Sequence, residues 1–137
     1  MNRARDWMRQ AERDLEHAQK SLELGHWEWA CFAAHQAAEK ALKAVYFALG
    51  AEAFGHALTH LLAGLHERLN LTPELRRCAL VLDRLYIPTR YPDSWEAGAP
   101  LDYYGEEEAR DALLCAGEIL RFGQSVLAGP GEAASGS

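Results

Sequence analysis

The sequence predicts an all-α protein, namely an antiparallel up-and-down four-helix bundle with an additional short helix. Apolar residues recur at three- and four-residue steps through three long segments, which is the pattern of amphipathic helices. No segment shows the two-residue alternation that is typical of a strand. Glycine, proline or a capping residue stands at most ends of the periodic segments. Long helices joined in part by shorter ones favour an antiparallel bundle.

The first two helices are predicted over residues 3–24 and 27–49. Gly25 and Gly50 follow their last periodic positions and are natural residues for ending a helix. Because alanine side chains are small, a seam of them lets another backbone approach toward the short end of the usual range of ~8–10 Å between helix axes. We therefore expect residues 27–49 to form the central helix of the bundle. Its alanine seam follows steps of four and three residues and comprises Ala30, Ala34, Ala37, Ala41, Ala44 and Ala48.

Two shorter helices and one long helix are predicted in the rest of the chain. Leucines at helical spacing predict a helix over residues 56–69. Thr72 and Pro73 supply an N-cap and a first-turn proline for the next helix, which ends before Pro88. The last helix is predicted over residues 106–127, where three glutamates favour its positive N-terminal end and a second heptad seam follows.

Residues 1–128 are predicted to form one helical domain, because 137 residues are enough for a single core but not for two. The low-complexity tail, residues 129–137, is expected to be disordered. The apolar fraction of 49% and the charged fraction of 25% are those of an ordinary soluble globule. The charged N-terminus lacks the apolar stretch of a secretory signal, and no apolar run reaches the roughly 18 residues of a membrane span. We expect a cytoplasmic protein with no membrane partner.

Charge and cysteine usage argue against two classes of function. A net charge of −6 argues against a nucleic-acid binder that works through bulk electrostatics. The three cysteines lie far apart with no CxxC pair, so we expect buried thiols and no zinc or thioredoxin-like motif. His56 and His60 lie four residues apart, but zinc would need a third ligand that no nearby residue supplies. We therefore expect no metal site.

The segment of residues 86–104 differs from the rest of the chain. It holds three of the five prolines and four of the five tyrosines, and it does not read as helix. Connections of this length without secondary structure are uncommon in compact domains and tend to be functional. Two structural uses stand beside a functional one: the segment crosses the end of the bundle with Tyr91 and Trp95 as plugs for the core, or it packs in a dimer.

Five residues of this segment are candidates for binding a ligand or a partner. Tyrosine and tryptophan offer faces for stacking, and prolines on either side of the arginine restrict the backbone. The arginine offers a planar fork suited to phosphate or carboxylate. The aspartate is expected to cap the turn and to orient the arginine. These candidates are Tyr86, Arg90, Tyr91, Asp93 and Trp95.

A second group of polar candidates belongs to the central helix and the segment after it. Glu39 and Lys43 lie four residues apart in the orientation that supports a helix, and Lys40 lies between them. Two interpretations are open: a solvated helix face, or polar groups that face a neighbouring subunit or a ligand. His56 is added to the second interpretation.

Four short motifs resemble the HEPN domain family (higher eukaryotes and prokaryotes nucleotide-binding). They are WMRQAERDLEHA, FAAHQAAEKALKA, GHALTHLL and YIPTRYPD, in this order along the chain. The resemblance covers about residues 7 to 127, nearly the whole domain. It implies an up-and-down four-helix bundle with an added short helix, usually dimeric and related to the C-terminal domain of kanamycin nucleotidyltransferase. It also implies a gene that often lies beside that of a minimal nucleotidyltransferase.

The resemblance extends only in part to catalysis. Many family members are RNA-cleaving toxins whose active site is an arginine, four to six residues, and then a histidine. No arginine and histidine in this chain have that spacing, and the last histidine is His66. The resemblance therefore favours a non-catalytic binding module, a homodimer or higher even oligomer, that presents the Arg90 segment to a nucleotidyltransferase, to a nucleotide such as a triphosphate, or to both. Two alternatives stay open: an atypical ribonuclease toxin, and a tyrosine acceptor of AMP from the partner enzyme.

Overall fold

The structure is a computed structural model that describes residues 3–86, 93 and 95–136, with side chains up to residue 129. Within these residues it contains helices and no strand, which confirms the predicted all-helical class. The helices are α1 (Ala4–Glu23), α2 (Trp27–Ala48), α3 (Leu58–Ala63), α4 (Pro73–Asp83), α5 (Pro100–Tyr103) and α6 (Glu106–Gly136). None of these described helices is long and apolar enough to cross a bilayer.

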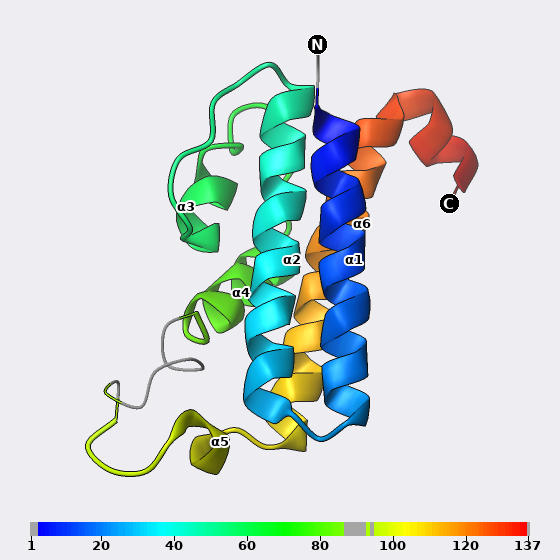
Figure 1. Cartoon of the computed structure of the whole chain (residues 1–137). Helices are drawn as coiled ribbons and strands as arrows, with labels where there is room; N and C mark the ends of the chain where they lie inside the picture. Colours follow the sequence, from blue (N-terminus) through cyan, green and yellow to red (C-terminus); the bar gives the residue numbers. More distant parts are fainter. Residues whose placement is uncertain (1–2, 87–92, 94, 137) are drawn as a thin grey trace.

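The three long helices lie side by side, except that the C-terminal end of α6 turns away from the other two (Figure 1). α1 runs antiparallel to both α2 and α6, whereas α2 and α6 run in the same direction (Figure 1). α2 packs extensively on both of its long neighbours. α4 packs obliquely on α6 and α2, and α3 packs on α4, so the two shorter helices cover the side of α2 and α6 away from α1.

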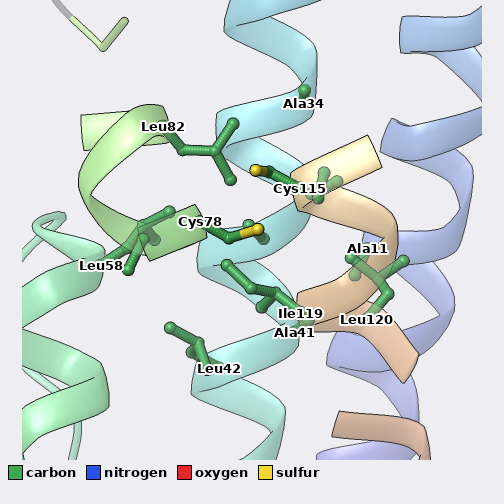
Figure 2. Packing of buried hydrophobic residues seen from close by; sticks show 14 of the residues in the cluster. Ala11, Ala34, Ala41, Leu42, Leu58, Cys78, Leu82, Cys115, Ile119 and Leu120 are labelled. Carbon is green, nitrogen blue, oxygen red and sulfur yellow. The ribbon is translucent and has the colours of Figure 1, made fainter. Parts of the chain in front are cut away.

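The alanine seam of α2 is the centre of the core, as the sequence predicts. Five of its six members are completely buried, and only Ala48, in the last turn, is exposed. α6 approaches α2 so closely that a Cβ at Gly123 would lie 3.3 Å from the carbonyl oxygen of Ala41 and 2.7 Å from Cε of Met8. Figure 2 shows Ile119 and Leu120 of α6 beside Ala41, with the larger side chains of α4 filling the remaining space. Small residues on both helices thus permit the close contact.

The helix predicted over residues 56–69 is shorter in the structure. Only α3, Leu58–Ala63, is α-helical, and the next bonds, such as Leu65 N–H to the Leu62 carbonyl, tighten to three-residue steps. The hydroxyl of Tyr46 donates a hydrogen bond of 2.7 Å to the Leu61 carbonyl. A Cβ at Gly64 would overlap this hydroxyl. The Tyr46 hydroxyl therefore uses the Leu61 carbonyl, which would accept from the Leu65 N–H if the α-helix continued.

The segment of residues 86–104 is not free of helix, so that prediction was wrong. Pro100 begins the short helix α5, and a carboxylate oxygen of Asp102 accepts a hydrogen bond of 2.9 Å from the Ala99 N–H. Proline in the first turn and an acidic residue three positions after the N-cap are start signals for a helix. These start signals did not predict a helix, because the helix that they begin is only four residues long.

The last helix, α6, extends to Gly136, which lies beyond the predicted end at residue 127. Its backbone leaves helical geometry at Gly129, where φ is 81° and ψ is 168°. A positive φ of this size favours glycine, which has no Cβ to clash. The boundary of the domain at residue 128 and the disorder of residues 129–137 stay predictions.

We predict that Ala41→Leu destabilises the fold by about 1–3 kcal/mol, because the added atoms must fit between α2 and α6 where no space remains. Ala48→Leu is the matched control in the same helix, and a change within about 0.5 kcal/mol is expected at this exposed position. Urea unfolding followed by far-UV circular dichroism measures both free energies. Equal stability of the two variants would contradict close packing at Ala41.

Candidate functional site

Four rings from three separate elements form a continuous row on the outside of α2. Trp29 contacts Phe32 with ring centroids 6.3 Å apart, Phe32 contacts Tyr86 at 6.3 Å, and Tyr86 stacks on His56 at 5.5 Å and an interplanar angle of 15°. Trp29 is 50% exposed, and the His56 side chain is 60% exposed. We call these four residues the aromatic stripe. The exposed rings at its two ends, Trp29 and His56, are therefore available for contact.

The stripe follows from the spacing of residues along α2 and from where the chain turns. Trp29 and Phe32 lie three residues apart, so they share a helix face. Tyr86 comes three residues after the last residue of α4, and His56 comes two residues before the first residue of α3. The C-terminal end of one short helix and the N-terminal end of the other thus meet at the same face of α2.

Beneath the stripe lies a completely buried histidine, His35 of α2. Its ring centroid is 4.6 Å from that of Tyr86, so Tyr86 contacts two imidazoles, those of His35 and His56. Nε2 of His35 lies 3.4 Å from a carboxylate oxygen of Asp83, which is long for a hydrogen bond. Neither ring nitrogen makes a shorter polar contact within the part of the chain that the structure describes. The interaction with Asp83 is therefore mainly electrostatic.

Asp83, the last residue of α4, caps the N-terminus of α3. Its carboxylate accepts hydrogen bonds from the N–H groups of Leu58 (2.7 Å) and Thr59 (3.0 Å) and from the Thr59 hydroxyl (2.9 Å). Burial raises the pKa of Asp83, but His35 and these hydrogen bonds outweigh burial and hold the pKa below its ordinary value. The carboxylate thus stays ionised and connects α2, α3 and α4 directly under Tyr86.

A second carboxylate, the buried Glu39, contacts His56 at the exposed end of the stripe. Glu39 is 5% exposed and accepts a hydrogen bond of 3.0 Å from the ammonium group of Lys43. Its two oxygens lie 3.1 and 3.0 Å from Nδ1 of His56. Lys43 also lies over the ring of Trp7, at 6.0 Å from its centroid. Because two donors surround the carboxylate, its burial is compensated, and the His56 ring is fixed in its stacked orientation.

The structure brings four of the predicted site residues together and separates others. Tyr86, His56, Glu39 and Lys43 meet at the aromatic stripe, whereas Lys40 pairs with Asp14 of α1. Arg90 and Tyr91 lie outside the described residues. Asp93 is exposed. Trp95 stacks on Tyr103 of α5 at 3.9 Å and contacts the edge of Tyr104 at 5.9 Å.

Four members of this arrangement were not among the predicted site residues, namely Trp29, Phe32, His35 and Asp83. His35, Glu39 and Lys43 recur at four-residue steps on one face of α2, and this signal was available in the sequence. The sequence held no such signal for Asp83, because its partners Leu58 and Thr59 are far away along the chain.

The described residues offer no metal centre and no reactive thiol. No group of three metal-ligating side chains occurs among them. His56 precedes α3, so it does not share a helix face with His60. Cys31, Cys78 and Cys115 are buried as predicted, and burial raises the pKa of the Cys31 thiol to about 12. A thiol with so high a pKa is protonated at neutral pH and is a poor nucleophile.

The described part of the site can therefore stack on a ligand or partner and orient it. Tyr86 offers a planar ring with contacts to both histidines, and the exposed Trp29 and His56 extend the aromatic surface. Rings held in place lose little conformational entropy when a ligand or partner stacks on them. The carboxylates of Asp83 and Glu39 lie beside the histidines and are largely used by contacts within the chain.

Comparisons with known proteins agree with one another. The family model of the HEPN domain matches residues 4–126. TT1696 from Thermus thermophilus has 51% sequence identity and a TM-score of 0.90, with 93% of this chain and 100% of that chain covered. ST0689, an archaeal HEPN homologue, has 41% identity and a TM-score of 0.79 (93% and 99% covered). A HEPN domain protein from Thermotoga maritima has 38% identity and a TM-score of 0.74 (90% and 98% covered). No curated protein matches this sequence.

We predict that Asp83→Asn destabilises the protein by about 1–3 kcal/mol at neutral pH, because an uncharged amide replaces the acceptor of three hydrogen bonds. The pKa of Asp83 is lowered on folding, so its contribution is present above the ordinary pKa of aspartate and is lost as the pH falls through the folded pKa. The difference between wild type and variant should therefore shrink in acid. Urea unfolding over a pH series measures it.

Asp6→Asn is the control for this experiment. Asp6 makes an exposed ion pair with Arg3 at 3.3 Å, so its replacement should have little effect at any pH. A loss at Asp83 that stays constant from neutral to acid pH would show that the charge of the carboxylate is not what stabilises the cap.

Proposed function

The chain belongs to the HEPN domain family, and we propose on this basis that it is a non-catalytic binding module of that family. It presents the aromatic stripe and the adjoining Arg90 segment to a nucleotide, to a nucleotidyltransferase partner, or to both. The pair of proteins would resemble a toxin–antitoxin system and would work in the cytoplasm. These finer statements are proposals that follow from family membership and from the site.

The observation that supports the proposal best is the contact of Tyr86 with two imidazoles. The ring centroid of the buried His35 lies at 4.6 Å, and His56 is stacked at 5.5 Å. A carboxylate lies beside each histidine, Asp83 beside His35 and Glu39 beside His56. A partly buried ring with these contacts is suited to stacking on a nucleobase or on a partner side chain. Packing alone would not require two polar rings in contact with the tyrosine.

The sequence next to Tyr86 supplies the group that would bind phosphate or carboxylate. Arg90 follows Tyr86 by four residues, and Pro88 and Pro92 on either side of it restrict the backbone. An arginine that follows a stacking residue closely in the sequence would match the two parts of a nucleotide, its phosphates and its base. The same two features match a partner protein that presents an acidic and an aromatic side chain.

We predict that Tyr86→Leu weakens binding of a nucleoside triphosphate or of the neighbouring nucleotidyltransferase by about 1–3 kcal/mol, because the stacking face is lost. Phe47→Leu is the matched control, since Phe47 stacks on Trp7 at 5.6 Å at the other end of α2. Isothermal calorimetry with ATP, and separately with the purified partner enzyme, measures both variants. Equal affinities of the two variants would remove Tyr86 from the site.

We predict that Arg90→Ala costs roughly 1.5–3 kcal/mol of binding free energy through loss of a charge-assisted contact, while the fold stays intact. The same calorimetry measures the loss, and thermal unfolding checks the fold. Reduced thermal stability with unchanged binding would show that the segment only plugs the end of the bundle.

Two outcomes would replace the proposal by one of its alternatives. Metal-independent cleavage of single-stranded RNA by the wild type, abolished in Arg90→Ala, would make the chain a ribonuclease with an atypical site. A mass increase of one AMP after incubation with the partner enzyme and ATP would make the chain an acceptor. Mass spectrometry of tyrosine-containing peptides would then locate the modified residue.

A further inference from the structure

The exposed end of the aromatic stripe carries a ring nitrogen that the stripe itself does not use. Nδ1 of His56 lies 3.1 and 3.0 Å from the two carboxylate oxygens of Glu39, a residue that is 5% exposed. The His56 side chain is 60% exposed, so the buried carboxylate accounts for only one edge of the ring. Within the described residues, Glu39 is the only hydrogen-bond partner of His56. Nε2, on another edge, is therefore the ring nitrogen left for a ligand.

The contact with Glu39 decides which nitrogen of His56 carries the proton in the neutral ring. An ionised carboxylate only accepts hydrogen bonds, so Nδ1 must donate and keeps its hydrogen. The ammonium group of Lys43, 3.0 Å from Glu39, favours the ionised carboxylate. Neutral His56 thus presents a lone pair on Nε2. A second proton adds there, and it converts Nε2 from an acceptor into a charged donor while the ring keeps its place.

Protonation of His56 changes the net charge at this end of the stripe. The titratable and charged groups around the ring, directly or through one neighbour, come from α2 and from the end of α4, and they are Glu39, Lys43, Tyr86, His35 and Asp83. The charges of Glu39 and Lys43 cancel, and the carboxylate of Asp83 accepts from the first amides of α3. The neutral ring therefore leaves this end without net charge, whereas the protonated ring adds one positive charge at the surface.

A positive charge at the edge of a stacking surface suits an anion that is attached to a flat ring. Aromatic rings stack through their faces, whereas the N–H groups of an imidazole lie in the ring plane and point outward from its edge. The side chains of Glu39 and Lys43 are only 7% and 15% exposed and pair with each other, so they do not compete for the ligand. Hydrogen bonds from an imidazolium to phosphate are charge-assisted and therefore strong. A nucleotide carries both the flat ring and the anion in one small molecule.

We propose that Nε2 of His56 binds a phosphate group of the nucleotide that stacks on the aromatic stripe, and that this binding takes up a proton from the solvent. The proton adds to Nε2, which then donates a hydrogen bond to a phosphate oxygen, and no covalent bond forms or breaks. Glu39 is a positioning residue, because it holds the Nδ1–H group and stabilises the imidazolium without touching the ligand. The inference rests on the proposed function and adds the group of the ligand that His56 recognises.

Proton uptake makes the affinity depend on pH in a defined direction. Imidazoles ordinarily titrate near pH ~6.5, within the range where a bound anion can change their charge. An anion that favours the imidazolium raises the midpoint of the His56 titration, and by linkage the nucleotide binds more tightly as the pH falls. Because most of the His56 side chain is exposed, solvent screens the contact, and a gain of about five- to tenfold is expected. This gain corresponds to a rise of about 0.7 to 1 pH units in the midpoint.

Nuclear magnetic resonance of the imidazole groups tests the contact directly. The titration of His56 is followed in the free protein and with saturating ATP, adenosine or inorganic triphosphate, and the signal that is lost in His56→Gln assigns it. We expect ATP and inorganic triphosphate to raise the midpoint of His56, and adenosine, which has no phosphate, to leave it unchanged. His60 of α3 is the internal control, and its midpoint should respond to none of the three.

Calorimetry on variants separates a charged contact from a stacking contact. The affinity of the wild type for ATP, divided by that of His56→Gln, should be about fivefold higher at about pH 6 than at about pH 8.5. The ratio removes the titration of ATP itself. Loss of a stacking ring alone would lower the affinity by the same factor at both pH values. His60→Gln is the matched control, because His60 is exposed and lies outside the stripe, and it should keep the wild-type profile.

Glu39→Gln tests the positioning role. The glutamine oxygen can still accept a hydrogen bond from Nδ1, but the negative charge is gone, so the imidazolium is less favoured. We expect the midpoint of His56 to fall and the pH profile of ATP binding to move to lower pH with it, while thermal unfolding checks the fold. An unchanged His56 midpoint in this variant would contradict the positioning role.

The three ligands keep this inference separate from the proposed function. ATP that binds without moving the His56 midpoint would overturn the inference and leave the nucleotide site in place. A midpoint raised by inorganic triphosphate in a protein that does not bind adenosine would support the anion contact and remove base stacking. A midpoint raised as much by adenosine as by ATP would overturn the inference, because phosphate would not be the cause. A wild type that binds none of the three would overturn both.

Discussion

The close approach of α2 to α6 is the constraint on which the rest of the structure depends. The completely buried alanines of α2 give it small side chains toward its neighbours, and Gly123 of α6 lets α6 approach the Ala41 carbonyl of α2. The larger side chains of α4 then pack beside this contact rather than within it (Figure 2). With its small face against α1 and α6, α2 has one face left for other residues. That face holds Trp29, Phe32 and His35, on which the candidate site is built.

The candidate site depends on two carboxylates, the buried Glu39 and the partly buried Asp83, that a purely apolar core would not contain. Burying an ion costs free energy unless hydrogen bonds and opposite charge compensate it, and replacing buried ion pairs by apolar residues is often neutral or stabilising. Asp83 is compensated by the N-terminus of α3 and by His35, and Glu39 by Lys43 and His56. In both cases the residue fixed by the carboxylate contacts Tyr86. This common feature explains why polar groups persist at a place where packing alone would favour leucine.

The sequence predicted the parts of this protein that depend on neighbours along the chain. The alanine seam, the Thr72–Pro73 start of α4 and the ends of α1 and α2 are local signals, and the structure follows them closely. The early end of α3 was missed because it involves Tyr46, from another helix, whose hydroxyl donates to the Leu61 carbonyl. Asp83 was missed for the same reason, since a cap from a distant helix leaves no periodic pattern. Tyr86, His56, Glu39 and Lys43 were named as candidates, but only the folded chain shows that they touch.

The cap that Asp83 supplies to α3 has a consequence for the order in which the chain folds. A helix of six residues is far too short to be stable in isolation, because nucleation is costly and few bonds repay it. The first amides of α3 obtain their acceptor from the end of α4, so α3 cannot persist before α4 has docked. The segment from residue 50 to residue 72 should therefore behave as one cooperative opening unit. In native-state hydrogen exchange its amides should exchange earlier than those of α2, and the opening of this unit would release His56 from Tyr86 while the three long helices stay folded.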